Sequence, residues 1–161
     1  LEMYISGVST RKVSQIVEKL CGKTINHKSF HIALGVTDEG DREIVGFMIQ
    51  NGEREASWSN FFDYLKNRGL SGTQLVISDA HSGLASAIRK SFTGVSRQRC
   101  QVHFMRNILS IIPKQDSKSF REFVKAIFQF TDIQFAKAAK NERLRIYADN
   151  KKYEKACQKL L

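Results

Sequence analysis

Leu75-Val76-Ile77-Ser78-Asp79-Ala80-His81-Ser82-Gly83 is the stretch that decides the fold of this 161-residue chain. Its apolar run, Leu75 to Ile77, is typical of a buried strand, and the small and polar residues after it end that strand. Strands of open α/β sheets present their chemistry at the carboxyl end, because the loop there holds a side chain rigidly while leaving it open to ligand. Asp79 is therefore the best candidate for a catalytic or metal-binding carboxylate.

The sequence before Asp79 predicts a hairpin and a helix. Phe30 to Val36 alternates with a period of two, residues 37–41 supply turn chemistry, and a second apolar run from Ile44 to Ile49 returns. The helix that follows ends near Gly69 and has an apolar face made of Trp58, Phe61, Phe62 and Leu65.

The sequence after Asp79 predicts a helix, a strand and a helical region. The helix turns Leu84, Ala87 and Ile88 inward, and the short strand covers Val95 to Val102. After Pro113 the pattern is helical throughout. One broad apolar face there consists of Phe120, Phe123, Val124, Ile127 and Phe128, and Phe135, Ala138 and Ala139 begin another. Helical spacing of large apolar residues favours burial of this stripe over a base-stacking platform.

The chain begins with a pattern typical of one amphipathic helix over Met3–Gly22. Ser9 or Thr10 can cap its start and Gly22 can end it. The first residue, Leu1, indicates an internal piece of a longer protein or an unusual translation start.

The net charge of +10 is concentrated in the last third of the chain. Residues 96–161 hold fifteen basic and six acidic side chains. A one-sided basic segment attracts phosphate, and nucleic acid is the usual partner. The alternative is a lysine-rich, soluble helical surface.

Three widely spaced cysteines, Cys21, Cys100 and Cys157, argue against a disulfide framework. The sequence shows no secretory signal and no apolar run long enough to cross a membrane. We therefore expect a cytoplasmic protein with no membrane partner.

Two blocks resemble the mutator-type transposases of bacterial insertion sequences. They are VISDAHSGLASAI at residues 76–88 and RCQVHFMRN at residues 99–107, and the resemblance runs from about Phe30 to Pro113 and more loosely to the end. It implies a ribonuclease H-like α/β fold and a transposase that cuts and joins DNA through three carboxylates. Asp79 would be the second catalytic acid and a ligand of Mg²⁺ or Mn²⁺. DNA, at element ends and target, would be the partner, and the intact protein would be a homo-oligomer.

The sequence departs from this family pattern at two carboxylates. The first strand, which carries the first Asp in the family, should precede Phe30, yet residues 23–29 contain no Asp or Glu and the strand looks deleted. The chain ends before a segment like the final Glu-bearing helix, and Glu154 matches the insertion better. We expect a partial mixed sheet lacking its first strand, and a marginal or aggregation-prone fold unless residues 23–29 or another chain fill the gap.

The resemblance also divides the chain. Residues 1–25 would be the remnant of a helical DNA-binding region, although a helix that simply packs on the core is an equally open interpretation. Residues 26–112 would be the incomplete catalytic core, and residues 113–161 a basic helical insertion at its C-terminal end.

Cys100 and His103 have the spacing of a zinc-binding pair, but a closed zinc site needs four ligands. The other candidates form no second pair at ligand spacing; they are Cys21, Cys157, His27, His31 and His81. We therefore expect no zinc and assign Cys100 and His103 a family-type role in shaping the site.

Four further residues, one just after Asp79 and three around Cys100 and His103, are candidate site residues with two interpretations each. His81 either lines the site or caps the following helix. Arg97, Arg99 and Arg106 either hold DNA phosphates or form a solvated basic edge.

Three functions remain open at this point. The first is a transposase fragment, inactive by itself because two of its three carboxylates are absent. The second is a non-catalytic DNA-binding fragment that interferes with an intact transposase. The third is an unrelated ribonuclease H-like nuclease with other acids, although Asp38, Glu39 and Asp41 are better explained as turn residues.

Overall fold

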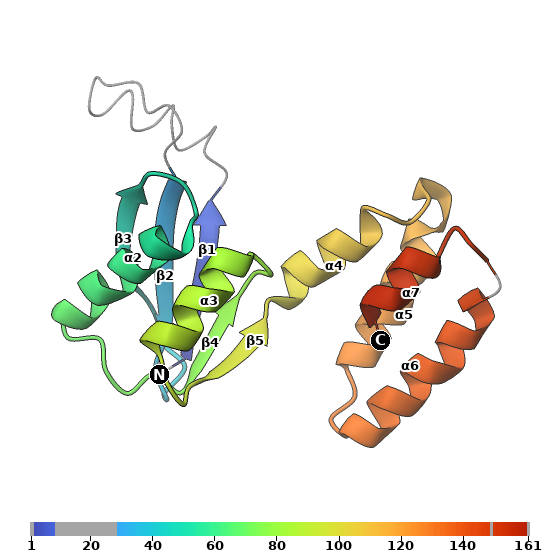
Figure 1. Ribbon diagram of the computed structural model, residues 1–161. Helices are drawn as coiled ribbons and strands as arrows, with labels where there is room; N and C mark the ends of the chain where they lie inside the picture. The colour runs from blue at the N-terminus through green and yellow to red at the C-terminus, as the bar shows by residue number, and fades with distance from the viewer. Residues whose placement is uncertain (1, 9–28, 149, 161) are drawn as a thin grey trace. The chain divides into compact units, whose positions relative to one another are not determined.

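The computed structural model describes residues 2–8, 29–148 and 150–160 (Figure 1). The chain divides into two compact units, Leu1–Cys100 and Gln101–Leu161. This division lies before the predicted domain boundary at residues 112/113, because residues 101–109 form a helix of the second unit.

The first unit is an α/β domain built on a mixed five-stranded sheet in the order β3-β2-β1-β4-β5. Its strands are β1 (Glu2–Val8), β2 (Ser29–Val36), β3 (Arg42–Gln50), β4 (Leu75–Ser78) and β5 (Ser96–Arg99). Strand β1 runs antiparallel to β2 and parallel to β4, and β4 runs parallel to β5. The sheet therefore consists of an antiparallel hairpin joined to a parallel half.

The central strand is β1, which corrects the prediction for the start of the chain. The expected helix over Met3–Gly22 is wrong for its first part, which is strand, and its remainder lies outside the described residues. The gap expected in the sheet is occupied, because β1 pairs with β2 on one side and β4 on the other. Pairing with β2 over Glu2–Val8 and with β4 over Glu2–Tyr4 satisfies backbone groups of the strand, and this tertiary gain outweighs a local helical pattern.

Two helices cover one face of this sheet, α2 (Glu55–Asn67) and α3 (Ser82–Ser91), as Figure 1 shows. The apolar faces predicted for them are confirmed. The core of the first unit consists of Met3, Ala33, Trp58, Phe61, Phe62, Leu65, Val76, Leu84, Ala87, Ile88 and Phe92. Strand β3 approaches α2 closely at Gly46, where an added Cβ would lie 2.6 Å from Leu65 Cδ2.

The hairpin of β2 and β3 is confirmed, and its turn uses the predicted residues. The Thr37 amide donates to the Asp41 carbonyl at 2.9 Å, and Gly40 adopts a φ of 92° that favours glycine. The last strand is shorter than predicted. It ends at Arg99 because β4, its partner among the described strands, ends at Ser78 in the paired register.

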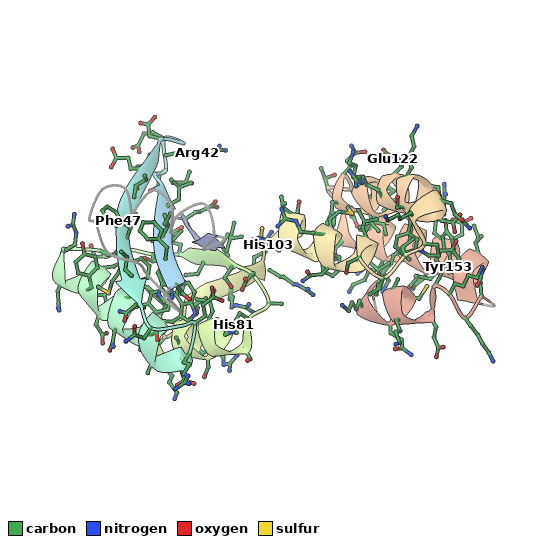
Figure 2. The ribbon with its side chains drawn as sticks, turned by 90° about the horizontal axis from the view of Figure 1, so that it is seen from above. Arg42, Phe47, His81, His103, Glu122 and Tyr153 are labelled. Atoms are coloured by element: carbon green, nitrogen blue, oxygen red, sulfur yellow. The ribbon has the colours of Figure 1, made fainter. Side chains whose placement is uncertain are left out.

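The second unit is helical: α4 (Gln101–Leu109), the 3-10 turn η1 (Lys114–Asp116), α5 (Ser117–Phe128), α6 (Ile133–Ala148) and α7 (Glu154–Leu160). Its core gathers Ile108, Ile112, Phe120, Phe123, Val124, Leu144, Tyr153 and Ala156. The Tyr153 hydroxyl, labelled in Figure 2, shares a hydrogen bond with Asp116 that, together with burial, raises the pKa of Tyr153 to about 12.

The burial predicted for the phenylalanine stripe is confirmed only in part. Phe120, Phe123 and Val124 are buried, whereas Phe128 is 40% exposed at the end of α5. The second predicted face on α6 is wrong at Phe135, which is 67% exposed, because α6 buries Leu144 instead. No helix among the described residues is long and apolar enough to span a membrane.

Candidate active-site carboxylate at the end of β4

Asp79 follows β4 directly, at the carboxyl end of the parallel half of the sheet. The strand before it is buried at Val76, Ile77 and Ser78, and Asp79 itself is half-buried. A rigid strand therefore carries the carboxylate to a point where the chain emerges from the sheet, as the sequence predicts.

The turn after Asp79 fixes its side chain. The His81 amide donates a hydrogen bond to Asp79 Oδ1 at 2.9 Å, the local side-chain-to-backbone bond that Asp favours at turns. His81 is the N-cap residue of α3, but its imidazole makes no capping hydrogen bond and is exposed. Its backbone carbonyl accepts from the Ala85 amide at 2.9 Å, so His81 starts the helix through its backbone.

Arg97 on β5 holds the backbone on which Asp79 stands. Its Nε donates to Ser78 Oγ at 3.0 Å and its Nη2 donates to the Asp79 carbonyl at 2.6 Å. The Ser78 hydroxyl donates in turn to the same Asp79 carbonyl at 3.0 Å. Burial lowers the pKa of Arg97, and Arg89 adds to this shift while Asp79 opposes it. We call this group of Ser78, Asp79 and Arg97 the Arg97 clamp.

The other candidate residues lie on the strand and helix that follow. Arg99 is the last residue of β5, in register with Ser78. Cys100 is half-buried, and its amide donates to the Ser78 carbonyl at 2.7 Å. His103 and Arg106 lie on α4 in the second unit. His103 Nδ1 is buried and has no hydrogen-bond partner among the described residues.

The central strand brings no second carboxylate to Asp79. Strand β1 pairs with β4 in a register that matches Tyr4 with Ile77, so position 6 of the chain lies abreast of Asp79. That position is serine, and residues 3–8 contain no Asp or Glu. Nor do the described residues contain any group of three or more His, Cys, Asp and Glu placed to hold a metal ion. Within the described part of the chain, the residues therefore do not fit a two-metal centre.

Sequence reasoning missed both the Arg97 clamp and a pocket between α4 and α5. The clamp leaves no sequence signal, because two strands must pair before Arg97 meets Ser78. The pocket has a signal in the sequence: Val102, Met105 and Leu109 recur at helical spacing. The strand predicted over Val95 to Val102 includes the first of these residues and so hides the start of the helix.

The family model and the relatives that match this chain all describe transposases. The chain matches the family described as Transposase, Mutator family, over residues 1–29 and 24–161. It is 53% identical over 207 aligned positions to the transposase for insertion sequence element IS256 in transposon Tn4001 of Staphylococcus aureus, covering 99% of the chain and 53% of that relative. It is 30% identical over 183 positions to the transposase for ISRM5 of Rhizobium meliloti, covering 85% of the chain and 46% of the relative.

The matches also show how much of these relatives the chain covers. The chain spans about half the length of these curated relatives. The alignment with the Staphylococcus aureus relative covers 207 positions, so this relative has residues inside the matched region that the 161-residue chain does not have. The two ranges matched by the family model overlap at residues 24–29. The predicted deletion lies at this point, just before Phe30. These findings exclude an unrelated nuclease, and the chain belongs to the Mutator family of transposases.

Proposed function

We propose that this chain is a part of an insertion-element transposase in which Asp79 is one of the catalytic carboxylates of a ribonuclease H-like core. The observation that carries the proposal is the position of Asp79, at the carboxyl end of a strand beside the central one, with its side chain held by the His81 amide. The sheet order β3-β2-β1-β4-β5, a hairpin followed by parallel strands, supports the ribonuclease H-like assignment. Within the first unit, His81 and Cys100 would shape the surroundings of the carboxylate.

Mg²⁺ or Mn²⁺ is the proposed cofactor of intact members of the family. Such ions activate the attacking oxygen and stabilise the leaving one when carboxylates from several elements hold them. This chain supplies the carboxylate of Asp79, but the position of β1 in register with Asp79 is a serine. We therefore propose that the 161-residue chain by itself neither cleaves nor joins DNA.

DNA is the proposed partner, and cytoplasm the proposed location. The excess of positive charge over residues 96–161 supports DNA binding, since clustered Lys and Arg displace counterions from phosphates. Arg99 at the end of β5 and Arg106 on α4 are the candidate phosphate contacts. A homo-oligomer is proposed for the intact transposase.

A second function is favoured by the missing carboxylate on β1. A chain that keeps the basic helical unit but lacks a complete acid set would occupy DNA without cutting it. We propose this interference with an intact transposase as the alternative function of the chain itself.

One experiment separates these functions. The purified chain is incubated with Mg²⁺ or Mn²⁺ and a plasmid that carries the ends of the Staphylococcus aureus relative's element, with and without that transposase. We expect no cleavage by the chain alone and reduced cleavage in the mixture, because the chain competes for DNA.

The matched control for this experiment is the Asp79→Asn variant. It should inhibit as well as the unchanged chain, since binding does not need the carboxylate. Metal-dependent cleavage by the chain alone that disappears in Asp79→Asn would show that the chain completes its own site and would overturn the inactive assignment. No effect of the chain on the mixture would remove the interference function.

A further inference from the structure

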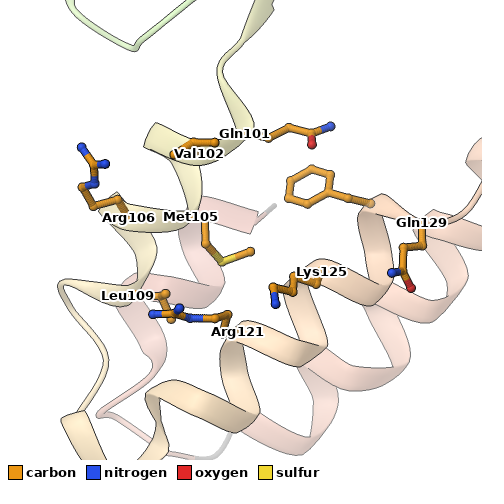
Figure 3. A pocket seen from close by; sticks show the side chains of 9 residues that line it. Gln101, Val102, Met105, Arg106, Leu109, Arg121, Lys125 and Gln129 are labelled. Atoms are coloured by element: carbon orange, nitrogen blue, oxygen red, sulfur yellow. The ribbon is translucent and has the colours of Figure 1, made fainter. Parts of the chain in front are cut away.

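A pocket with a volume of about 610 Å³ lies between α4 and α5 in the second unit (Figure 3). Helix α4 contributes Gln101, Val102, Met105, Arg106 and Leu109, and α5 with the residue after it contributes Arg121, Lys125, Phe128 and Gln129. All nine residues belong to one compact unit. The size falls within the range of pockets that bind small organic molecules.

The apolar lining of this pocket is uncovered. Val102 is 64% exposed and Phe128 is 40% exposed, and Met105 and Leu109 continue the apolar surface along α4. The Phe128 ring is held by an edge contact with Phe104, whose centroid lies 6.0 Å away. A fixed aromatic ring at a pocket wall offers a stacking surface to a flat ligand.

The charged side chains that line the pocket are all positive. Arg106, Arg121 and Lys125 are cationic, and none of the nine residues is acidic. Figure 3 shows Lys125 pointing into the pocket and Arg121 reaching toward Leu109 on α4. Lys125 also contacts Glu122 at 3.3 Å, but both side chains are more than half exposed and such a pair is weak.

The polar side chains that line the pocket can form hydrogen bonds with the edge of a flat ring. Gln101 and Gln129 lie on one side of the pocket, opposite Arg106 and Leu109 (Figure 3). A side-chain amide offers one acceptor and two donors, the combination that pairs with the edge of a nucleobase. An acidic peptide would use the cations but would have no need of two amides beside an aromatic ring.

We propose that this pocket binds an unpaired nucleotide of DNA, with the base stacked on Phe128 and the flanking phosphates held by Arg121 and Lys125. The ligand must be unpaired, because a base inside a duplex exposes only its edges and not the face that stacks on a ring. The inference rests on the proposed function in that DNA is the partner. It goes beyond that function by naming a single-strand site in the helical unit.

The test compares single-stranded and duplex DNA on the full 161-residue chain. Fluorescence anisotropy measures affinity for a labelled oligothymidylate of about 12 nucleotides and for a duplex of the same length in the same salt. Phe128→Ala should weaken single-strand binding about tenfold or more and leave duplex binding within about twofold. Phe135→Ala is the matched control: Phe135 is an exposed phenylalanine of the same unit that does not line the pocket, and it should change neither affinity.

A second pair of variants tests the phosphate contact. Arg121→Gln should weaken single-strand binding more than Lys118→Gln, since both side chains are exposed on α5 but only Arg121 lines the pocket. Circular dichroism of each variant verifies that the helices remain folded.

The other outcomes overturn the inference in distinguishable ways. If Phe128→Ala weakens both DNA forms equally or neither, the ring is not a stacking surface and the site fails while DNA binding stands. If the chain binds neither form, the proposed function fails together with the inference. If an acidic helical peptide binds in a Phe128-dependent manner and oligothymidylate does not, the pocket is a protein-docking surface.

Discussion

Asp79 depends on its neighbours for its position, and the Arg97 guanidinium donates both to its backbone carbonyl and to the Ser78 hydroxyl. We predict that Arg97→Lys loosens the turn, because a lysine keeps the charge but cannot donate to Ser78 and Asp79 from one planar group. The His81 amide, which bonds the Asp79 carboxylate, should exchange with solvent about tenfold faster in hydrogen-exchange NMR.

Binding of duplex DNA supplies the control for Arg97→Lys. If Arg97 is a clamp, Arg97→Lys and Arg97→Gln should both speed exchange at His81 and have little effect on duplex affinity. If Arg97 instead contacts phosphate, only Arg97→Gln should weaken binding, and exchange at His81 should stay unchanged.

His31 makes the stability of the first unit depend on pH. Its side chain is fully buried and stacks on Trp58, with ring centroids 3.6 Å apart. Burial lowers the pKa of His31 from 6.5 to about 4, and the backbone of Gly52 offsets part of this shift. The folded state therefore binds fewer protons than the unfolded state between these two values. This contribution to stability is complete above pH 6.5 and is lost as the pH falls toward 4.

We predict that His31→Phe flattens this dependence. The change keeps an aromatic ring against Trp58 and removes the titrating group. Chemical denaturation at several pH values should show that the unchanged chain loses up to about 3 kcal/mol more than the variant between pH 6.5 and 4. His81→Gln, a change at an exposed histidine, should leave the slope as it is.

At the scale of elements, the first turn of α3 fits closely against the segment that leads into α2. A Cβ on Gly83 would lie 2.9 Å from the Glu55 amide nitrogen and 3.0 Å from the Glu53 carbonyl oxygen. Backbone atoms cannot move aside as a flexible side chain can. We predict that Gly83→Ala destabilises the chain by about 1–3 kcal/mol, although the same change in an exposed helix interior stabilises by about 1 kcal/mol.

Thermal or chemical unfolding of Gly83→Ala shows directly whether the change lowers or raises the free energy of unfolding. Ser82→Ala, at an exposed neighbouring position of the same helix, is the control and should have a small effect. A stabilised Gly83→Ala variant would mean that α3 does not pack on residues 53–55.

At the scale of the whole molecule, most of the excess positive charge belongs to the helical unit and not to the unit that contains the sheet. The excess of basic residues lies beyond residue 95, mostly in the helical unit. We predict that affinity for duplex DNA falls steeply with salt and depends weakly on sequence, because released counterions supply the binding energy. Each phosphate contact should contribute about −0.9 to the slope of log affinity against log salt concentration.

Charge reversal tests this distribution. Arg106→Glu should lower the magnitude of the slope by about one contact or more, whereas Glu39→Lys, at the hairpin turn of the first unit, should leave it nearly unchanged. Equal effects of the two variants would mean that the helical unit is not the preferred DNA contact.

The sequence alone determined the elements whose residues repeat at a clear period. The hairpin of β2 and β3, the buried faces of α2 and α3, and the strand that leads to Asp79 were all predicted, because burial of one face imposes the period directly on the residues. Two specific blocks around Asp79 and Cys100 were enough to indicate the family that the comparisons show.

Only the tertiary structure decided what depends on pairing between distant segments. Residues 3–8 fall at the start of the helix predicted over Met3–Gly22 but belong to the central strand, because β2 and β4 both offer that strand backbone partners. Arg97 meets Ser78 only when β5 pairs with β4, and Phe128 lines a pocket only when α4 packs beside α5. Local patterns record burial of a face. They do not show which distant segment will supply the hydrogen-bond partners of a strand's backbone. For that reason the central strand of the sheet and the pocket were not predicted from the sequence.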